Sequence, residues 1–154
     1  MGYCLLLLSL VLGGMSSRQF IQDRERGKPG QQYVAEMLRS WGHEVEEVPD
    51  GYFPGYDLKL KIGGTIEVKH DYLSEKTGNV FLELEALNHS QADWLAIVTD
   101  NPRTVFMIPL TEARRIAREY PRKVRGGEFN GWGAIPPKAF LAKQDYVQVL
   151  TTNQ

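Results

Sequence analysis

Two carboxylates and a lysine lie close together between residues 57 and 69, which read Asp-Leu-Lys-Leu-Lys-Ile-Gly-Gly-Thr-Ile-Glu-Val-Lys. Apolar and polar residues alternate on either side of the Gly-Gly pair, and this pattern predicts a β-hairpin. Asp57 lies on the first expected strand, and Glu67 and Lys69 lie on the second. Two carboxylates and a lysine on one face of a hairpin can support metal-dependent cleavage of a phosphodiester.

The buried face should set the register of this hairpin. A two-residue turn would place leucines opposite charged residues. A three-residue loop over residues 62–64 avoids this, and such loops commonly contain a glycine in the left-handed region. The loop would pair Asp57 with Lys69. It would also pair Lys59 with Glu67. We predict this register, or a bulge with the same result, in which one face is apolar (Leu58, Leu60, Ile66 and Val68) and the other polar (Asp57, Lys59, Lys61, Thr65, Glu67 and Lys69).

The polar face predicts a particular chemistry. Asp57 and Glu67 could hold Mg²⁺, for which Mn²⁺ could substitute, with the backbone carbonyl of Val68 as a further ligand. The ion would polarise a phosphate oxygen and lower the pKa of a bound water. Lys69 would stabilise the negative charge that develops in the transition state. The alternative for a Glu-x-Lys pattern is an ordinary solvated strand face.

The order of these motifs resembles the PD-(D/E)xK nuclease superfamily, which includes restriction endonucleases, Holliday-junction resolvases and phage exonucleases. The resemblance covers about residues 29–110. Four segments carry it: a first helix and strand (Lys28 to Val45), a first acidic motif (Phe53 to Asp57), a second acidic motif (Ile66 to Lys69), and a downstream strand and helix-strand (Thr77 to Glu85 and Ser90 to Leu95).

This resemblance implies an α/β (α+β) fold with a restriction-endonuclease-like core, a mixed central β-sheet flanked by helices. It implies a Mg²⁺-dependent DNA endonuclease of phage or junction-resolving type, with an exonuclease or an RNA target left open. The alternative is a non-catalytic nucleic-acid or protein-binding module on the same fold. Two departures are visible. Tyr56 stands where members have a proline before the aspartate, and Gln32 stands where many have a glutamate. Glu36, one turn later, is the nearby acid that could substitute.

Further site residues are expected outside the hairpin. Glu83 could approach the metal or order a water if its strand lies beside the Glu67 strand, and otherwise it is an exposed strand carboxylate. Residues 103–125 carry seven basic side chains against two acidic ones. We interpret this segment as a phosphate-binding stripe, or else as a solvated amphipathic helix with a basic tail. The expected nucleic-acid contacts are Arg103, Arg114, Arg115, Arg118 and Gln91.

Composition excludes several other classes. The chain has 154 residues and a net charge of −1, so it is not a basic nucleic-acid coat. Its single cysteine, Cys4, excludes an internal disulfide and a cysteine zinc site. The three histidines are scattered without ligand spacing, and we see no glycine-rich phosphate loop. We therefore expect no organic cofactor.

The N-terminus carries the apolar run Leu5 to Leu12, which is too short to span a bilayer. It resembles a signal-peptide core, but no lysine or arginine precedes it. We interpret residues 1–14 as an over-extended start or an appendage to a single cytoplasmic, nuclease-like domain at 15–154 that has no membrane contact. An export signal is the alternative. A homodimer, built on tryptophans and Tyr120, would allow both DNA strands to be cut.

Periodicity and turn residues predict the remaining elements. We expect a helix at 29–40, a strand at 43–48, a polar loop at 71–78, a strand at 80–84, a turn or short helix at 86–93, strands at 94–99 and 104–109, a helix at 111–120, and one or two late strands within 129–150.

Overall fold

The computed structural model describes residues 17–49, 55–119, 121–124 and 129–151. The expected N-terminal extension 1–14 and Tyr120 lie outside these ranges, as do parts of the first acidic motif and of the basic segment. The elements are α1 (Ser17–Ser40), β1 (Val45–Glu47), β2 (Leu58–Leu60), β3 (Thr65–His70), α2 (Ser74–Thr77), β4 (Leu82–Glu83), α3 (Leu84–His89), β5 (Trp94–Thr99), β6 (Thr104–Pro109), α4 (Leu110–Glu119), β7 (Arg122–Lys123), β8 (Trp132–Ala134), α5 (Lys138–Ala142) and β9 (Gln148–Leu150).

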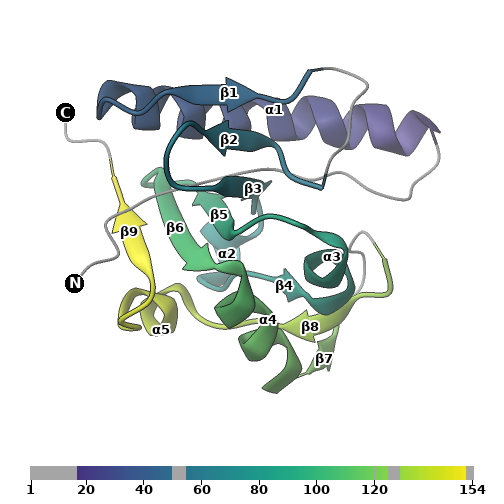
Figure 1. The fold of residues 1–154 in the computed structure, drawn as a ribbon. Helices are drawn as coiled ribbons and strands as arrows, with labels where there is room; N and C mark the ends of the chain where they lie inside the picture. The colour runs from purple at the N-terminus through teal and green to yellow at the C-terminus, as the bar shows by residue number, and fades with distance from the viewer. Residues whose placement is uncertain (1–16, 50–54, 120, 125–128, 152–154) are drawn as a thin grey trace.

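A six-stranded mixed sheet with the order β1-β2-β3-β5-β6-β9 forms the centre of the molecule (Figure 1). Strands β3 and β5 run parallel, and the other neighbouring strands of this sheet run antiparallel. Helices lie on both sides of it. The expectation of an α+β fold with a mixed central sheet flanked by helices is therefore confirmed.

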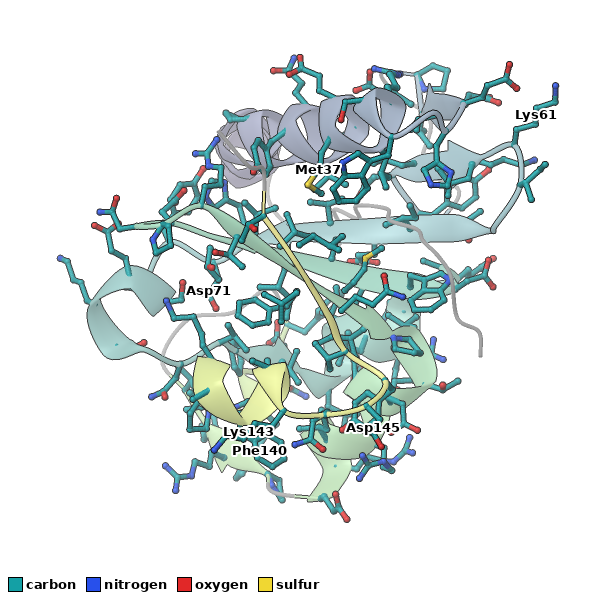
Figure 2. All side chains as sticks on the ribbon, turned by 90° about the vertical axis from the view of Figure 1, so that its left-hand side faces the viewer. Met37, Lys61, Asp71, Phe140, Lys143 and Asp145 are labelled. Carbon is teal, nitrogen blue, oxygen red and sulfur yellow. The ribbon has the colours of Figure 1, made fainter. Side chains whose placement is uncertain are left out.

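Helix α1 covers one face of the sheet. Its buried side chains follow the helical spacing of an amphipathic stripe and meet the apolar face of the hairpin. Met37 points from α1 toward the strands in Figure 2. This core cluster contains Val34, Ala35, Met37, Leu38, Leu58, Leu60, Ile66, Val68, Ala96, Val98, Val105 and Met107.

The opposite face of the sheet is covered by α3, α4 and a second, three-stranded sheet with the order β4-β8-β7 (Figure 1). Side chains that alternate with the first set along β5 and β6 pack here, among them Leu95, Ile97, Phe106 and Ile108. Leu141 of α5 belongs to the same cluster. The molecule thus has three layers, and the central sheet is apolar on both faces.

Helix α1 starts earlier than expected. It begins at Ser17 and contains Pro29, where the sequence suggested a helix start. A proline is favoured in the first turn but is costly inside a helix, so the expectation followed the more common case. The end is as expected, because Gly42 follows the helix in the left-handed region with φ of 92°.

The other expected elements agree with the structure to different degrees. Strands 94–99 and 104–109 are confirmed with the predicted bounds. The strand expected at 43–48 is shorter, and the polar loop 71–78 contains α2. The strand expected at 80–84 shortens to β4 and belongs to the second sheet. Among the described residues, no helix has the length and apolar character needed to cross a membrane.

Candidate active site

The hairpin of β2 and β3 carries the residues that suggested chemistry. Leu58 pairs with Ile66 and Lys59 pairs with Thr65, so the predicted register is wrong by two residues. A shift of two residues leaves every side chain on its predicted face. Leu58 and Ile66 are buried under α1, while Asp57 and Glu67 lie on the opposite face.

The turn explains the difference in register. The Leu60 amide donates to the Gly64 carbonyl at 3.0 Å, which closes a loop over residues 61–63. The start of β3 is then fixed from outside the hairpin. Asp93 Oδ2 accepts the Thr65 amide at 2.8 Å, and the Asp93 amide donates to the Thr65 carbonyl at 3.0 Å. A hydrophobic pattern cannot report this contact, because Asp93 is distant in sequence.

Asp57, Glu67 and Lys69 are brought together on the face that is turned away from α1. Asp57 Oδ2 accepts a hydrogen bond from the Val68 amide at 3.2 Å, which holds this carboxylate against β3. Lys69 Nζ lies 3.9 Å from Glu67 Oε2. The Glu67 side chain is 1% exposed and the Lys69 side chain is 30% exposed, so the lysine connects a buried carboxylate to solvent.

These donors suit a hard divalent cation. Asp57 and Glu67 are both buried carboxylates, and placing two such groups on one small surface is costly without nearby positive charge. Lys69 supplies one positive charge. Carboxylate oxygens completed by waters are the ligands that Mg²⁺ prefers. In the part of the chain that the structure describes, no group of three or more His, Cys, Asp or Glu side chains could hold a metal ion. The site therefore depends on two carboxylates.

Glu36 is not brought to this site, contrary to the prediction. Residues 34, 35, 37 and 38 of α1 face the sheet, and helical geometry places residue 36 on the opposite side of the helix. Glu36 and Gln32 are exposed. Helix α1 also covers the face of the sheet opposite Glu67, so neither side chain lies near Glu67.

The strand that carries Glu83 does not lie beside β3, as the prediction required. Its strand, β4, pairs with β8, whereas β3 is flanked by β2 and β5. Glu83 is buried, and its Oε2 accepts the backbone amides of Phe129 at 3.1 Å and Gly131 at 2.7 Å. These bonds fix the turn before β8. Glu83 also lines a pocket with Lys69, described below.

Gln91 lies close to the first acidic motif. Its amide donates to the Gly55 carbonyl at 3.0 Å, and Ser90 Oγ donates to the same oxygen at 3.3 Å. A Cβ on Gly55 would lie 3.1 Å from Gln91 Cβ. The exposed Gln91 side chain therefore stands beside the segment that leads into Asp57.

The predicted basic stripe is divided in the structure. Arg103 lies in the β5–β6 turn, over the Tyr33 ring of α1 at 5.2 Å. Arg114 lies on the opposite layer, where it donates to the carbonyls of Leu87 at 3.1 Å and Ser90 at 2.8 Å. Among the predicted nucleic-acid contacts, Arg114 has a structural role, because its guanidinium donates hydrogen bonds to carbonyls at the end of α3.

Arg115 and Arg118 of α4 differ in whether their side chains are already engaged in hydrogen bonds. Arg115 donates to Glu112 and Glu119, each at 2.7 Å, and to Tyr146 Oη at 3.0 Å. Its hydrogen bond with Glu112, opposed by burial, raises the pKa of the Arg115 guanidinium. Arg118 is exposed, and no hydrogen bond of its side chain is seen within the described ranges. Arg118 is therefore the better placed of the two to meet a phosphate.

A pocket of about 530 Å³ opens beside Lys69. Lys69, His70, Asp71, Tyr72 and Leu73 form one side of it. Apolar side chains of β4, α3 and β5 form much of the rest, and the further lining residues are Phe81, Leu82, Glu83, Ala86, Leu87, Leu95 and Ile97. Pockets of this size and composition accept small organic groups.

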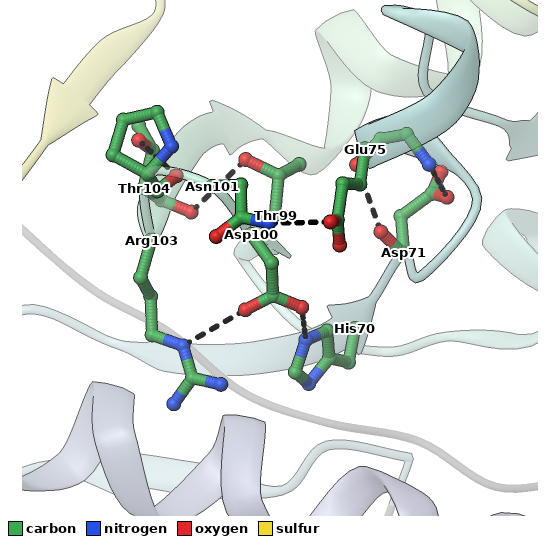
Figure 3. A network of polar contacts seen from close by, with 10 residues as sticks. His70, Asp71, Glu75, Thr99, Asp100, Asn101, Arg103 and Thr104 are labelled. Carbon is green, nitrogen blue, oxygen red and sulfur yellow. Dashed lines mark hydrogen bonds and ion pairs between the residues drawn. The ribbon is translucent and has the colours of Figure 1, made fainter.

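A network of polar contacts surrounds His70, which follows Lys69 and faces α1, because a Cβ on Gly30 would lie 3.2 Å from His70 Nδ1 (Figure 3). His70 Nε2 lies 2.7 Å from Asp100 Oδ2, and Arg103 Nε donates to Asp100 Oδ1 at 3.0 Å. Burial raises the pKa of Asp100, but the hydrogen bonds and charges of His70 and Arg103 outweigh it, so the pKa is lowered. The His70 ring in turn stacks on Tyr72 with centroids 3.9 Å apart.

Sequence reasoning missed the supporting role of Asp71 and Asp100. It placed Asp71 at the start of a polar loop and Asp100 between two strands. The sequence contains a local signal for Asp71 alone, because an Asp three residues before Ser74 is a common start for a helical turn. The Asp100–His70 contact joins residues 30 positions apart and left no signal in the pattern.

Comparison of the chain with protein-family models and with curated proteins gives no match in either case.

Proposed function

We propose that this protein is a metal-dependent nuclease that hydrolyses phosphodiester bonds in DNA, with Asp57, Glu67 and Lys69 as its catalytic set. The observation that carries the proposal is that these three side chains, from β3 and from the residue just before β2, share one face, with Lys69 Nζ 3.9 Å from Glu67 Oε2. Two acids and a lysine in this arrangement are what the chemistry needs.

The order and direction of the elements support a restriction-endonuclease-like core. A helix, α1, is followed by the antiparallel strands β1, β2 and β3, then by α3 and by β5, which runs parallel to β3. This is the element order in which the sequence resembles PD-(D/E)xK nucleases. The acidic residues fall on β3 and at the start of β2.

The residues present would divide the chemistry among them. Asp57 and Glu67 would hold Mg²⁺, or Mn²⁺ in its place, and the backbone of Val68 orients Asp57 through its amide. When bound, the ion supplies a Lewis acid for the phosphate oxygen and an acidified water. Lys69 would donate a hydrogen bond to the phosphate and offset its growing negative charge. Gln91 and Glu83 would contact the substrate from the two sides of this set.

A non-catalytic nucleic-acid-binding or protein-binding module on the same fold is a second candidate. The observation that favours it is the position of Glu36, which faces away from the sheet that carries Glu67. The described residues therefore offer two acids at the site and no third. In a nuclease, two acids and a lysine suit one metal ion rather than two.

The test is cleavage of supercoiled plasmid and of single-stranded, duplex and branched oligonucleotides, in Mg²⁺, Mn²⁺ or EDTA. Lys69→Ala should lower the cleavage rate about 10²- to 10³-fold, because it removes one group that stabilises transition-state charge. Lys59→Ala is the matched control, since Lys59 is an exposed lysine of the same hairpin that pairs with Thr65. It should cleave at the rate of the wild type.

Metal-dependent cutting that Lys69→Ala abolishes and Lys59→Ala retains would support the nuclease. Absence of cutting on every DNA form, by a protein with a cooperative unfolding transition, would contradict it and favour the binding module. The same oligonucleotides made as RNA decide which nucleic acid is the substrate. A size measurement on the DNA complex tests whether two copies act together, with the exposed Trp41 and Trp132 as candidate interface residues.

A further inference from the structure

The pocket beside Lys69 has an aromatic and apolar lining that the cleavage chemistry does not use. Tyr72 is 45% exposed and stands at its edge, and Phe81 lies on another part of the lining. Leu87, Leu95 and Ile97 are buried beneath them. Apolar surface in an open pocket is removed from water when an apolar, flat group enters, which lowers the free energy.

Asp71 holds two sides of this pocket in fixed positions. Its Oδ1 accepts the Ser74 amide at 3.0 Å, which shapes the turn that carries Tyr72 and Leu73. Its Oδ2 accepts the Phe81 amide at 2.9 Å, which fixes the segment before β4. A single carboxylate therefore ties the two walls together, and the pocket is formed before any ligand binds. Asp71 lies at the left of Figure 2.

Tyr72 is also held in place. Its ring stacks on the His70 ring at an interplanar angle of 14°, and His70 is in contact with Asp100 at 2.7 Å. An aromatic ring that is already ordered loses little conformational entropy when a second ring stacks on it. His70 itself packs against α1, so the stack fixes Tyr72 at the end of β3, beside the pocket that Tyr72 lines.

The pocket is continuous with the proposed catalytic set, because Lys69 belongs to both. A ligand that places an anionic group at Lys69 and a flat, largely apolar group in the pocket combines the two features. A nucleotide is such a ligand, with a phosphate for the lysine and a base for the pocket. A lipid chain or an aliphatic peptide would not use the aromatic wall.

We infer that this pocket receives one unpaired nucleobase of the DNA substrate, next to the phosphate that is cut. The inference rests on the proposed nuclease function and names its substrate class: DNA with an unpaired base at the cleavage position, as in single strands, overhangs and branch points. A base inside a duplex must first leave its stack, which costs free energy. Two of the polar lining residues, Asp71 and Glu83, already accept backbone amides, and stacking does not depend on base identity, so any of the four bases is accepted.

The test removes the base instead of the protein side chain. A single abasic residue is moved through a fluorescent single-stranded oligonucleotide, and the affinity of the full chain is measured in EDTA, where no cleavage occurs. An abasic residue at the position next to the cut should weaken binding about 5- to 150-fold, the loss of one stacked base. Abasic residues elsewhere should have a small effect.

Protein variants then assign the effect to the pocket. Tyr72→Ala should bind weakly to the intact strand and no longer distinguish the abasic strand, whereas Tyr72→Phe should behave as the wild type because it keeps the ring. Phe140→Ala is the matched control, since Phe140 is an exposed aromatic residue of α5 that does not line the pocket. It should keep the full abasic effect.

The outcomes separate the two proposals. Cleavage in Mg²⁺ with no position-specific abasic effect overturns the base pocket and leaves the nuclease standing. A position-specific effect that Tyr72→Ala removes, without cleavage in any metal, supports the pocket and overturns the nuclease. Failure to bind any strand in EDTA, together with no cleavage in any metal, overturns both.

Discussion

A backbone hydrogen bond holds the Asp57 carboxylate in place. One of its oxygens accepts the Val68 amide at 3.2 Å, so an asparagine could keep this bond through its side-chain carbonyl. The change Asp57→Asn therefore removes charge with little effect on the local geometry. Because a cation prefers a carboxylate to a neutral amide, the variant isolates the metal-binding role of this residue.

The expected result is a loss of stabilisation by metal. At a Mn²⁺ or Mg²⁺ concentration about ten times Kd, binding to the folded state adds about 1.4 kcal/mol of stability. For a domain of this size, that raises the Tm of the wild type by about 3 to 6 °C. Asp57→Asn should show no rise, as measured by calorimetry with and without metal. The exposed Glu46→Gln is the control, and an equal rise in wild type and Asp57→Asn would contradict a site at Asp57.

Asp100 leads to a prediction about pH. Its partners lower its pKa from 3.8, so the folded state binds a proton less readily than the unfolded state. The stability that Asp100 contributes is then fully present above about pH 3.8. It is lost as the pH falls through the lowered folded-state value.

Asp100→Asn should therefore cost about 1 to 3 kcal/mol at neutral pH, the usual range for hydrogen bonds to a charged group. The difference in unfolding free energy from the wild type should shrink toward zero below pH 3.8. Urea denaturation between pH 3 and pH 7 measures this, with the exposed Asp145→Asn as control. A difference that stays constant over this range would show that the Asp100 charge is not involved.

At the residue scale, the sequence predicted side-chain types and faces but not partners. Asp57, Glu67 and Lys69 were predicted to share a face because strand side chains alternate, and they do. Glu36 was proposed because it lies one turn after Gln32, where the resemblance implies a glutamate, and the helix places it on the outward face. The contacts of Asp71 and Asp100 depend on tertiary packing that no local pattern records.

At the element scale, the hairpin shows where a periodic pattern stops being informative. A slip of one residue would have exchanged the two faces, and the hydrophobic pattern excludes it. A slip of two residues keeps both faces, so the pattern cannot detect it. The register was decided by the turn and by Asp93, which holds Thr65 at 2.8 Å. The helix and strand bounds were predicted best where neighbouring elements leave sharp turn signals, as at 94–99 and 104–109.

A substitution at Gly64 tests whether the turn and Asp93 determine the register. It lies at φ of 103°, and a Cβ there would lie 2.5 Å from Asp93 Oδ2. Gly64→Ala should therefore strain the turn and displace the side chain that fixes the register. We expect a loss of about 1 to 3 kcal/mol in unfolding free energy by urea denaturation, typical of overpacking.

The control for Gly64→Ala is Ile62→Ala at the tip of the same loop. Ile62 is 83% exposed, so its loss should change stability by less than about 0.5 kcal/mol. If Gly64→Ala is as stable as Ile62→Ala, the turn does not determine the register and the Asp93 contact is not the reason for the observed pairing.

At the scale of the whole molecule, the three layers separate groups that are close in sequence. The basic segment looked continuous in the chain, but the central sheet places Arg103 near α1 and the arginines of α4 on the other side. Counting basic residues along the sequence therefore overestimates how many of them can contact DNA on one surface. The proposed catalytic face and the pocket lie on the α3 side of the sheet, so substrate must approach from there.

Comparing Arg118 with Arg114 of α4 distinguishes an arginine that contacts DNA from an arginine with a structural role. Arg118 is exposed, whereas Arg114 donates to two carbonyls at the end of α3. If Arg118 contacts a phosphate, Arg118→Ala should reduce the slope of log affinity against log salt by about 0.9 and leave stability unchanged. Arg114→Ala should do the reverse, because two carbonyls lose their donor: about 1 to 3 kcal/mol less stability and an unchanged slope. Salt titrations of DNA binding, with urea denaturation of the same variants, measure both. Equal slopes for Arg118→Ala and the wild type would move the DNA path away from α4.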